Sequence, residues 1–127
     1  MKKQSDIDKF EKVEAQLNAL HKELGVLSKK KPDDGINPFK LKLVNSVLEK
    51  ANELLEKKYK PFSDFELFDL DDVPTNSDVV TILAQYLNCM EELRSDNIKT
   101  CAGDWVWYIG NNKTAIRTAP PKKLTER

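Results

Sequence analysis

The sequence has too little histidine, cysteine and glycine for most kinds of catalytic or cofactor site. Its single histidine, His21, has no second histidine or cysteine nearby that would complete a metal site. Its two cysteines, Cys89 and Cys101, form neither a CxxC pair nor a disulfide framework. Its four glycines are too scattered to form a loop that cradles phosphate. These absences favour a protein that is not an enzyme and that uses no cofactor or metal.

Long apolar runs are also absent. No run approaches the roughly 18 apolar residues that a membrane-spanning helix needs. The first residues lead directly into a charged amphipathic stretch, so no signal peptide is expected. The 127 residues, 39% hydrophobic and 33% charged, are typical of one soluble domain. We therefore expect a cytoplasmic protein without membrane contacts, with a domain over residues 1–118 and a flexible tail over residues 119–127.

The clearest positive signal is an apolar heptad near the N-terminus. Its members recur at steps of three and four residues: Phe10, Val13, Leu17, Leu20, Leu24 and Leu27. This spacing places them on one stripe of a helix predicted over residues 6–28, which another helix or a second copy must cover. Three heptads are few for a coiled coil. Packing within one chain is therefore favoured, and a dimer through this helix stays open.

Two further amphipathic helices are predicted. Asn37 and Pro38 form a helix start, and the apolar stripe that follows ends near Lys58. Thr75 or Asn76 caps a third helix, apolar over most of its circumference, that ends at about residues 95–97. Together with the first helix, these predict a mainly α protein built on a three-helix bundle.

The segment between the second and third helices alternates acidic and apolar residues. Ser63 and residue 66 have the spacing of a capping box, which predicts a short acidic-aromatic helix over residues 64–70. Its candidate interaction residues are Asp64, Glu66, Asp69, Asp71 and Asp72. Their spacing lacks the central glycine and terminal glutamate of an EF-hand loop. Solvation, or docking of a basic partner, is favoured over metal binding.

A β-hairpin is predicted at the C-terminus. Its first strand contains three aromatic residues, Trp105, Trp107 and Tyr108. A turn at residues 110–112 leads to a second strand that ends at Thr118. If residues 111 and 112 form the loop, Ile109 faces Thr114 and Trp105 faces Thr118. A lone hairpin is marginal in water, so it must pack on the helices or on a partner. The expected fold class is therefore α+β, with the hairpin docked on the bundle.

These features predict a non-catalytic protein–protein interaction module, such as an adaptor, regulator or assembly subunit. Three surfaces are expected to bind a protein partner or a second copy. The first is the N-terminal stripe with Phe10, Leu17, Leu20 and Leu24, the second is the acidic segment, and the third is the hairpin with Trp105, Trp107 and Tyr108.

Nucleic acid is the alternative partner. The order of three helices and a hairpin resembles that of winged helix-turn-helix proteins. However, helix three carries four acidic residues against Arg94 alone, and phosphate would repel it. A single strand could instead stack on the hairpin rings beside Lys113 and Arg117. Charge favours binding of a single strand to the hairpin. Residues 64–104, which include helix three, carry ten acidic and two basic groups, whereas residues 105–127 carry one acidic and five basic groups.

Overall fold

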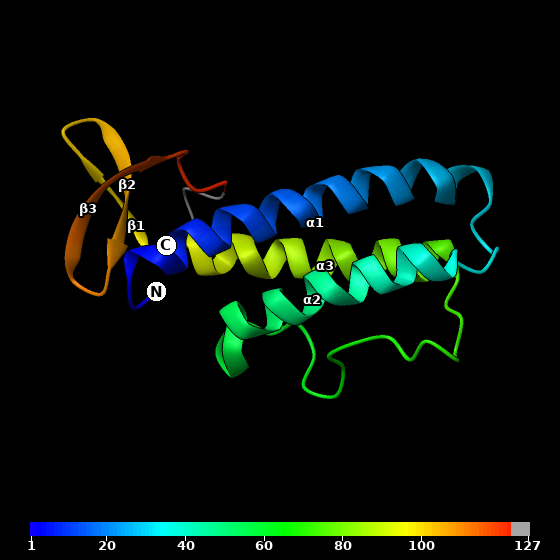
Figure 1. The fold of residues 1–127 in the computed structure, drawn as a ribbon. Helices are drawn as coiled ribbons and strands as arrows, with labels where there is room; N and C mark the ends of the chain where they lie inside the picture. Colours follow the sequence, from blue (N-terminus) through cyan, green and yellow to red (C-terminus); the bar gives the residue numbers. More distant parts are fainter. Residues whose placement is uncertain (123–127) are drawn as a thin grey trace.

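The computed structural model describes residues 1–122, which form three helices followed by a three-stranded antiparallel sheet (Figure 1). The elements are α1 (Gln4–Lys30), α2 (Pro38–Tyr59), α3 (Asn76–Ser95), β1 (Ile98–Cys101), β2 (Asp104–Ile109) and β3 (Asn112–Thr118). The three helices lie side by side, and each contacts the other two. The sheet lies at the end where α1 begins and α3 ends. The architecture is therefore α+β.

The N-terminal heptad is buried inside this chain. Phe10, Val13, Leu17 and Leu24 are each at most 1% exposed, and Leu20 and Leu27 are partly buried against the same core. α1 is two residues longer at each end than predicted and continues through Gly25. Its N-cap is Lys3, whose backbone N–H donates to the Asp6 carboxylate. The helices of this chain therefore cover the stripe, which is not an exposed surface in the structure.

α2 and α3 begin where their capping residues predict. Asn37 Oδ1 accepts a hydrogen bond from the Phe39 N–H at 2.8 Å. Thr75 Oγ1 accepts from the Asp78 N–H at 3.1 Å, and the Asp78 carboxylate accepts from the Thr75 N–H at 3.2 Å. These bonds satisfy N–H groups that have no partner within the helix. α2 ends at Tyr59, one residue beyond the predicted end.

The predicted short helix over residues 64–70 is wrong. Residues 60–75, which we call the acidic loop, contain turns and bends but no helix or strand. The loop returns along α2 to the start of α3 (Figure 1). Side chains of α2 bind the backbone of Glu66 and Phe68, so these groups are satisfied from outside the loop. A local helix is therefore not needed to satisfy them.

The sheet includes a strand that the sequence did not predict. β1 pairs with β2, with Ile98 opposite Trp107, and the sheet order is β1-β2-β3. The predicted hairpin is thus the outer part of a larger sheet. Ile98 is 5% exposed and belongs to the core. A tight turn joins the two strands through Ala102 and Gly103, which both have positive φ, 53° and 89°.

The register of β2 with β3 differs from the prediction at the turn. At the open end, Trp105 lies opposite Thr118 as predicted. Near the turn, Ile109 lies opposite Asn112 rather than opposite the predicted partner, Thr114. An irregularity in the middle of β2 absorbs the difference. Gly110, with φ 60°, adopts the left-handed conformation that this turn requires.

Candidate interaction face

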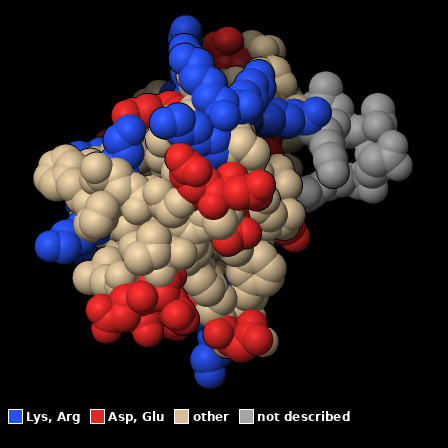
Figure 2. Space-filling model, turned by 90° about the vertical axis from the view of Figure 1, so that its right-hand side faces the viewer, with Lys and Arg blue, Asp and Glu red and all other residues tan. Residues whose placement is uncertain are grey.

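Five of the six exposed large hydrophobic side chains of residues 1–122 belong to segments that meet at one end of the molecule, where α1 ends and α2 and α3 begin. We call this surface the end face. Its apolar members are Val26, Phe39, Leu43, Leu70 and Val73, which are 54, 68, 44, 48 and 55% exposed. Figure 2 views this end and shows a broad uncharged surface between charged groups. Exposed apolar residues that gather in this way are typical of a contact surface, whereas single ones are not.

The exposure of Phe39 and Leu43 follows from their positions on α2. The buried stripe of this helix consists of Leu41, Val44, Val47, Leu48, Ala51 and Leu55. Phe39 and Leu43 are four residues apart and therefore lie on one face of the helix, outside that stripe. This pair is the signal by which the sequence could have revealed the end face. Neither residue was among the predicted interaction residues.

The two connections at this end are bonded to each other. The Ile36 N–H donates to the Pro74 carbonyl oxygen at 2.9 Å, and residues 35 and 75 form a β-bridge. Val73 packs closely on Gly35. A Cβ added at residue 35 would lie only 2.8 Å from Val73 Cγ1, which is too close for any residue other than glycine. Val73 is therefore held in place by a backbone approach that only glycine allows. The end face is preorganised by these contacts.

Two asparagine side chains hold the acidic loop along α2. Asn45 Nδ2 donates to the Phe68 carbonyl oxygen, and Asn45 Oδ1 accepts from the Phe68 N–H, both at 2.9 Å. Asn52 Nδ2 donates to the Glu66 carbonyl oxygen at 2.9 Å, and its Oδ1 accepts from the Tyr86 hydroxyl at 2.6 Å. Burial raises the pKa of Tyr86 to about 12, so the hydroxyl keeps the proton that it donates to Asn52 even in mildly alkaline solution. No pattern in the sequence marked either asparagine.

We expect Asn45→Ala to lower the free energy of unfolding by about 1–3 kcal/mol, because the half-buried N–H and C=O of Phe68 lose their partners. Urea denaturation measures the change. Ser46→Ala, at the next and exposed position of α2, is the control and should change stability by less than about 0.5 kcal/mol. Hydrogen exchange should be faster at the Phe68 amide of the Asn45 variant. Unchanged protection there would contradict the anchoring role.

Acidic side chains flank the end face. Residues 64–78 include six acidic residues and no basic one. The five predicted interaction residues of this segment are all exposed: Asp64, Glu66, Asp69, Asp71 and Asp72. Asp33 and Asp34, in the connection from α1 to α2, are exposed as well. Figure 2 shows acidic groups above and below the uncharged surface, and basic groups at the top, over the end of α1.

The other predicted interaction residues lie elsewhere. Phe10, Leu17 and Leu24 are in the core and Leu20 is partly buried against it. The hairpin lies at the opposite end of the molecule from the end face (Figure 1). The three predicted surfaces therefore do not combine into one site, and only the acidic segment contributes to the end face.

The three aromatic residues of β2 have different surroundings. Trp107 is 1% exposed and makes an edge contact with Phe10, with ring centroids 5.0 Å apart. Trp105 is partly buried against the same core. Tyr108 is half-buried, and Lys99 Nζ lies 4.8 Å from its ring centroid. Of the three rings, Trp107 is thus not accessible for stacking on a single strand.

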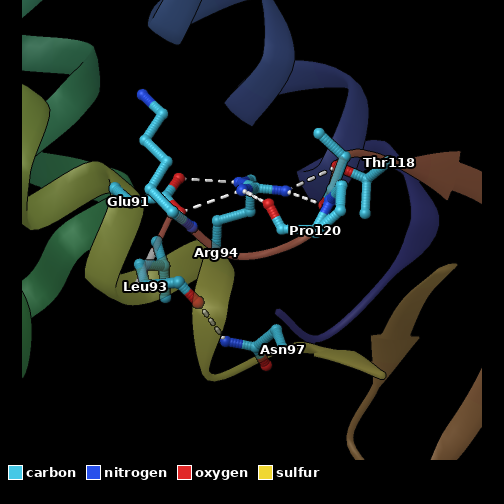
Figure 3. A network of polar contacts seen from close by, with 8 residues as sticks. Glu91, Leu93, Arg94, Asn97, Thr118 and Pro120 are labelled. Atoms are coloured by element: carbon cyan, nitrogen blue, oxygen red, sulfur yellow. Dashed lines mark hydrogen bonds and ion pairs between the residues drawn. The ribbon is translucent and has the colours of Figure 1, made fainter. Parts of the chain in front are cut away.

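A buried polar network joins α3 to the end of the sheet (Figure 3). Arg94 is 5% exposed, and its Nε and Nη2 donate to the two carboxylate oxygens of Glu91 at 2.8 and 2.9 Å. Its remaining acceptors are Thr118 Oγ1, the Ala119 carbonyl oxygen and the Pro120 carbonyl oxygen. The five N–H groups of a guanidinium all have partners here, so the network offers no donor to a ligand.

The same network holds part of the expected tail. The Lys122 N–H donates to Glu91 at 3.0 Å, so residues 119–122 lie against α3. The rest of the expected tail, residues 123–127, lies outside the described residues.

The described residues contain no metal-binding cluster, membrane-spanning helix or disulfide. Within residues 1–122, no three His, Cys, Asp or Glu residues are arranged to hold a metal ion. None of the helices there combines the length and apolar character needed to cross a bilayer. Cys89 and Cys101 are free thiols, and burial raises the pKa of Cys89. Comparison with family models, curated proteins and solved structures finds no match to this chain.

Proposed function

We propose that this protein is a non-catalytic interaction module, an adaptor, regulator or assembly subunit, and that the end face binds a protein partner. One observation carries the proposal: Phe39 and Val73 are more than half exposed. Both belong to segments that meet where two connections are bonded in place. The helices, as a three-helix bundle, would serve as the rigid support of this surface.

The arrangement has the features of a small interface. Energetically dominant contacts of interfaces are enriched in aromatic residues and lie near the centre of the patch, whereas the rim is polar. Phe39 is the most exposed large apolar side chain of the end face, and Asp33, Asp34 and the aspartates of the acidic loop form its polar surroundings. Because connections that are already ordered lose little freedom on binding, such a face is suited to docking.

We expect a photo-crosslinking residue at position 39 to capture a protein partner from cell extract, and the same residue at position 67 to capture none. Leu67 is the matched control because it is also an exposed apolar residue, 42% exposed, but lies away from the end face. It is in the acidic loop beside Glu49 and Asn52, which are in the middle of α2. The captured partner, identified and purified, should bind Phe39→Ser about tenfold or more weakly than the unchanged protein.

Two results would contradict the proposal. One is equal affinity of the purified partner for Phe39→Ser and the unchanged protein. The other is capture that nuclease treatment removes, which would indicate nucleic acid as the partner. Circular dichroism of Phe39→Ser serves as the folding control, and we expect an unchanged spectrum because the side chain is 68% exposed.

A further inference from the structure

We infer that the end face recognises a cationic amphipathic segment, one whose apolar side chains are flanked by lysine or arginine. The inference rests on the proposed function and adds the chemistry of the partner.

The carboxylates around the end face have no ion-pair partner among the described residues. Five aspartates come from its two connections: Asp33, Asp34, Asp69, Asp71 and Asp72. Among residues 1–122, none of the five forms an ion pair with a lysine, arginine or histidine. Exposed Lys42 lies beside Leu43 on the α2 side of the face, so the negative potential is concentrated on the side of the acidic loop. There it can attract a partner's cations, which raises the rate of encounter and selects against acidic partners.

Apolar and acidic groups alternate on this surface in a way that suits one segment. Leu70 and Val73 lie in the acidic loop among the aspartates, and Phe39 and Leu43 project from the start of α2. Figure 2 shows the uncharged surface between two acidic groups. A segment lying across it would place its apolar side chains against these four residues and its cations over the carboxylates on either side.

The basic edge of the end face constrains the orientation of the partner. Lys29, Lys30 and Lys31 are exposed at the end of α1, where Figure 2 shows basic groups at the top. These lysines repel the partner's cations. The cationic part of the partner should therefore lie over the acidic loop and not over α1.

A second copy of this chain is a poorer occupant. A two-fold contact brings the same patch of both copies together. At the end face it would place the acidic loop of one copy against the acidic surface of the other, and like charges at a contact are unfavourable.

The test uses a fluorescein-labelled synthetic peptide of about 20 residues, with leucine along one helical face and lysine on both sides of it. A second peptide has glutamate in place of every lysine. Fluorescence anisotropy measures binding to the whole protein. We expect the lysine peptide to bind at least about tenfold more tightly than the glutamate peptide at about 50 mM salt, and the difference to shrink at about 300 mM.

Variants of the protein locate the binding site. Asp69→Asn, Asp71→Asn and Asp72→Asn combined should weaken binding of the lysine peptide about tenfold at low salt. In the unchanged protein, Asp69 Oδ1 accepts a hydrogen bond from the Asp71 N–H. Asparagine at position 69 also has an Oδ1, so this bond and the turn are retained. The matched control changes the net charge equally at exposed acidic positions elsewhere: Asp8→Asn, Glu11→Gln and Glu49→Gln. Light scattering of the unlabelled protein reports self-association.

The outcomes separate the inference from the proposed function. Equal binding of the two peptides, equal weakening by the control variant, or no binding of the lysine peptide up to about 100 μM overturns the cationic partner. None of these results affects the crosslinking experiment, which decides whether the face binds a protein at all. Binding of the lysine peptide that Phe39→Ser leaves unchanged places the peptide away from the end face and overturns the inference, and the crosslinking experiment still decides the proposed function. A dimer that Phe39→Ser dissociates identifies a second copy as the occupant and also overturns the inference.

Discussion

Replacing Trp107 with alanine is expected to lower the free energy of unfolding by about 3–5 kcal/mol. The ring is 1% exposed and contacts Phe10 of α1 edge-on, and it lies opposite Ile98 of β1. Its removal would leave a cavity where the sheet meets the helices, because the surrounding elements can collapse only partly. Urea denaturation followed by circular dichroism measures the change.

Two further variants make this result specific. Trp107→Phe should cost less, about 1–2 kcal/mol, because phenylalanine keeps an aromatic ring at this position, and within residues 1–122 the indole Nε1 has no hydrogen bond to lose. Tyr108→Ala, at the next position of β2, should cost about 1 kcal/mol because the ring is only half-buried. A loss below about 1 kcal/mol for Trp107→Ala would contradict a core position. It would make the ring available to a ligand.

Replacing Arg94 with alanine is expected to cost about 3–5 kcal/mol, because it leaves a half-buried carboxylate without its cation. Glu91 loses two hydrogen bonds, and the acceptors at the end of β3 and in residues 119–120 lose theirs. Arg117→Ala is the matched control. That side chain is 79% exposed and pairs with Asp104 at 3.6 Å, so its loss should cost no more than about 0.5 kcal/mol.

The pH dependence of the Arg94 variant tests the same network. Burial by itself would raise the pKa of Glu91, but the hydrogen bonds from Arg94 and the Lys122 N–H outweigh it and lower the pKa below the ordinary 4.5. The Glu91 carboxylate therefore binds a proton more readily in the unfolded chain than in the folded protein. The network stabilises the fold fully above pH 4.5, and this stabilisation is lost as the pH falls through the lowered pKa that Glu91 has in the folded protein. Without Arg94, its hydrogen bonds and its charge no longer lower the pKa of Glu91, so the pKa rises and this pH-dependent stabilisation becomes smaller.

The stability difference between the unchanged protein and Arg94→Ala should therefore narrow as the pH falls from 7 to about 3.5. Urea denaturation at several pH values measures it. A difference that stays constant over this range would mean that Glu91 does not contribute through Arg94.

The starts of α2 and α3 were predictable because their signals are short-range. The Asn37 and Thr75 side chains bond N–H groups two or three residues further along the chain, so neighbouring residues decide the outcome. The burial of the heptad was predictable for a similar reason, since periodicity fixes which side chains share one helix face. The residues that cover this helix face were not predictable, because they belong to other helices and to the sheet.

The acidic loop and β1 show where local reasoning fails. The spacing of Ser63 and Glu66 is that of a capping box, but Asn45, 23 residues away from Phe68, and Asn52, 14 residues away from Glu66, bind the loop backbone instead. β1 has four residues and depends on β2 for its hydrogen bonds. Neither outcome is encoded within the segment itself.

The sequence by itself determined the order of the helices, the inward face of each, and the acidic character of the segment between α2 and α3. The tertiary structure decided which connections meet. It brought Gly35 against Val73 and left Phe39 exposed beside the acidic loop, and so it created the end face. The physical reason is range: periodicity and capping act over one or two helical turns, whereas the backbone bonds and packing that assemble a surface join residues far apart in the chain.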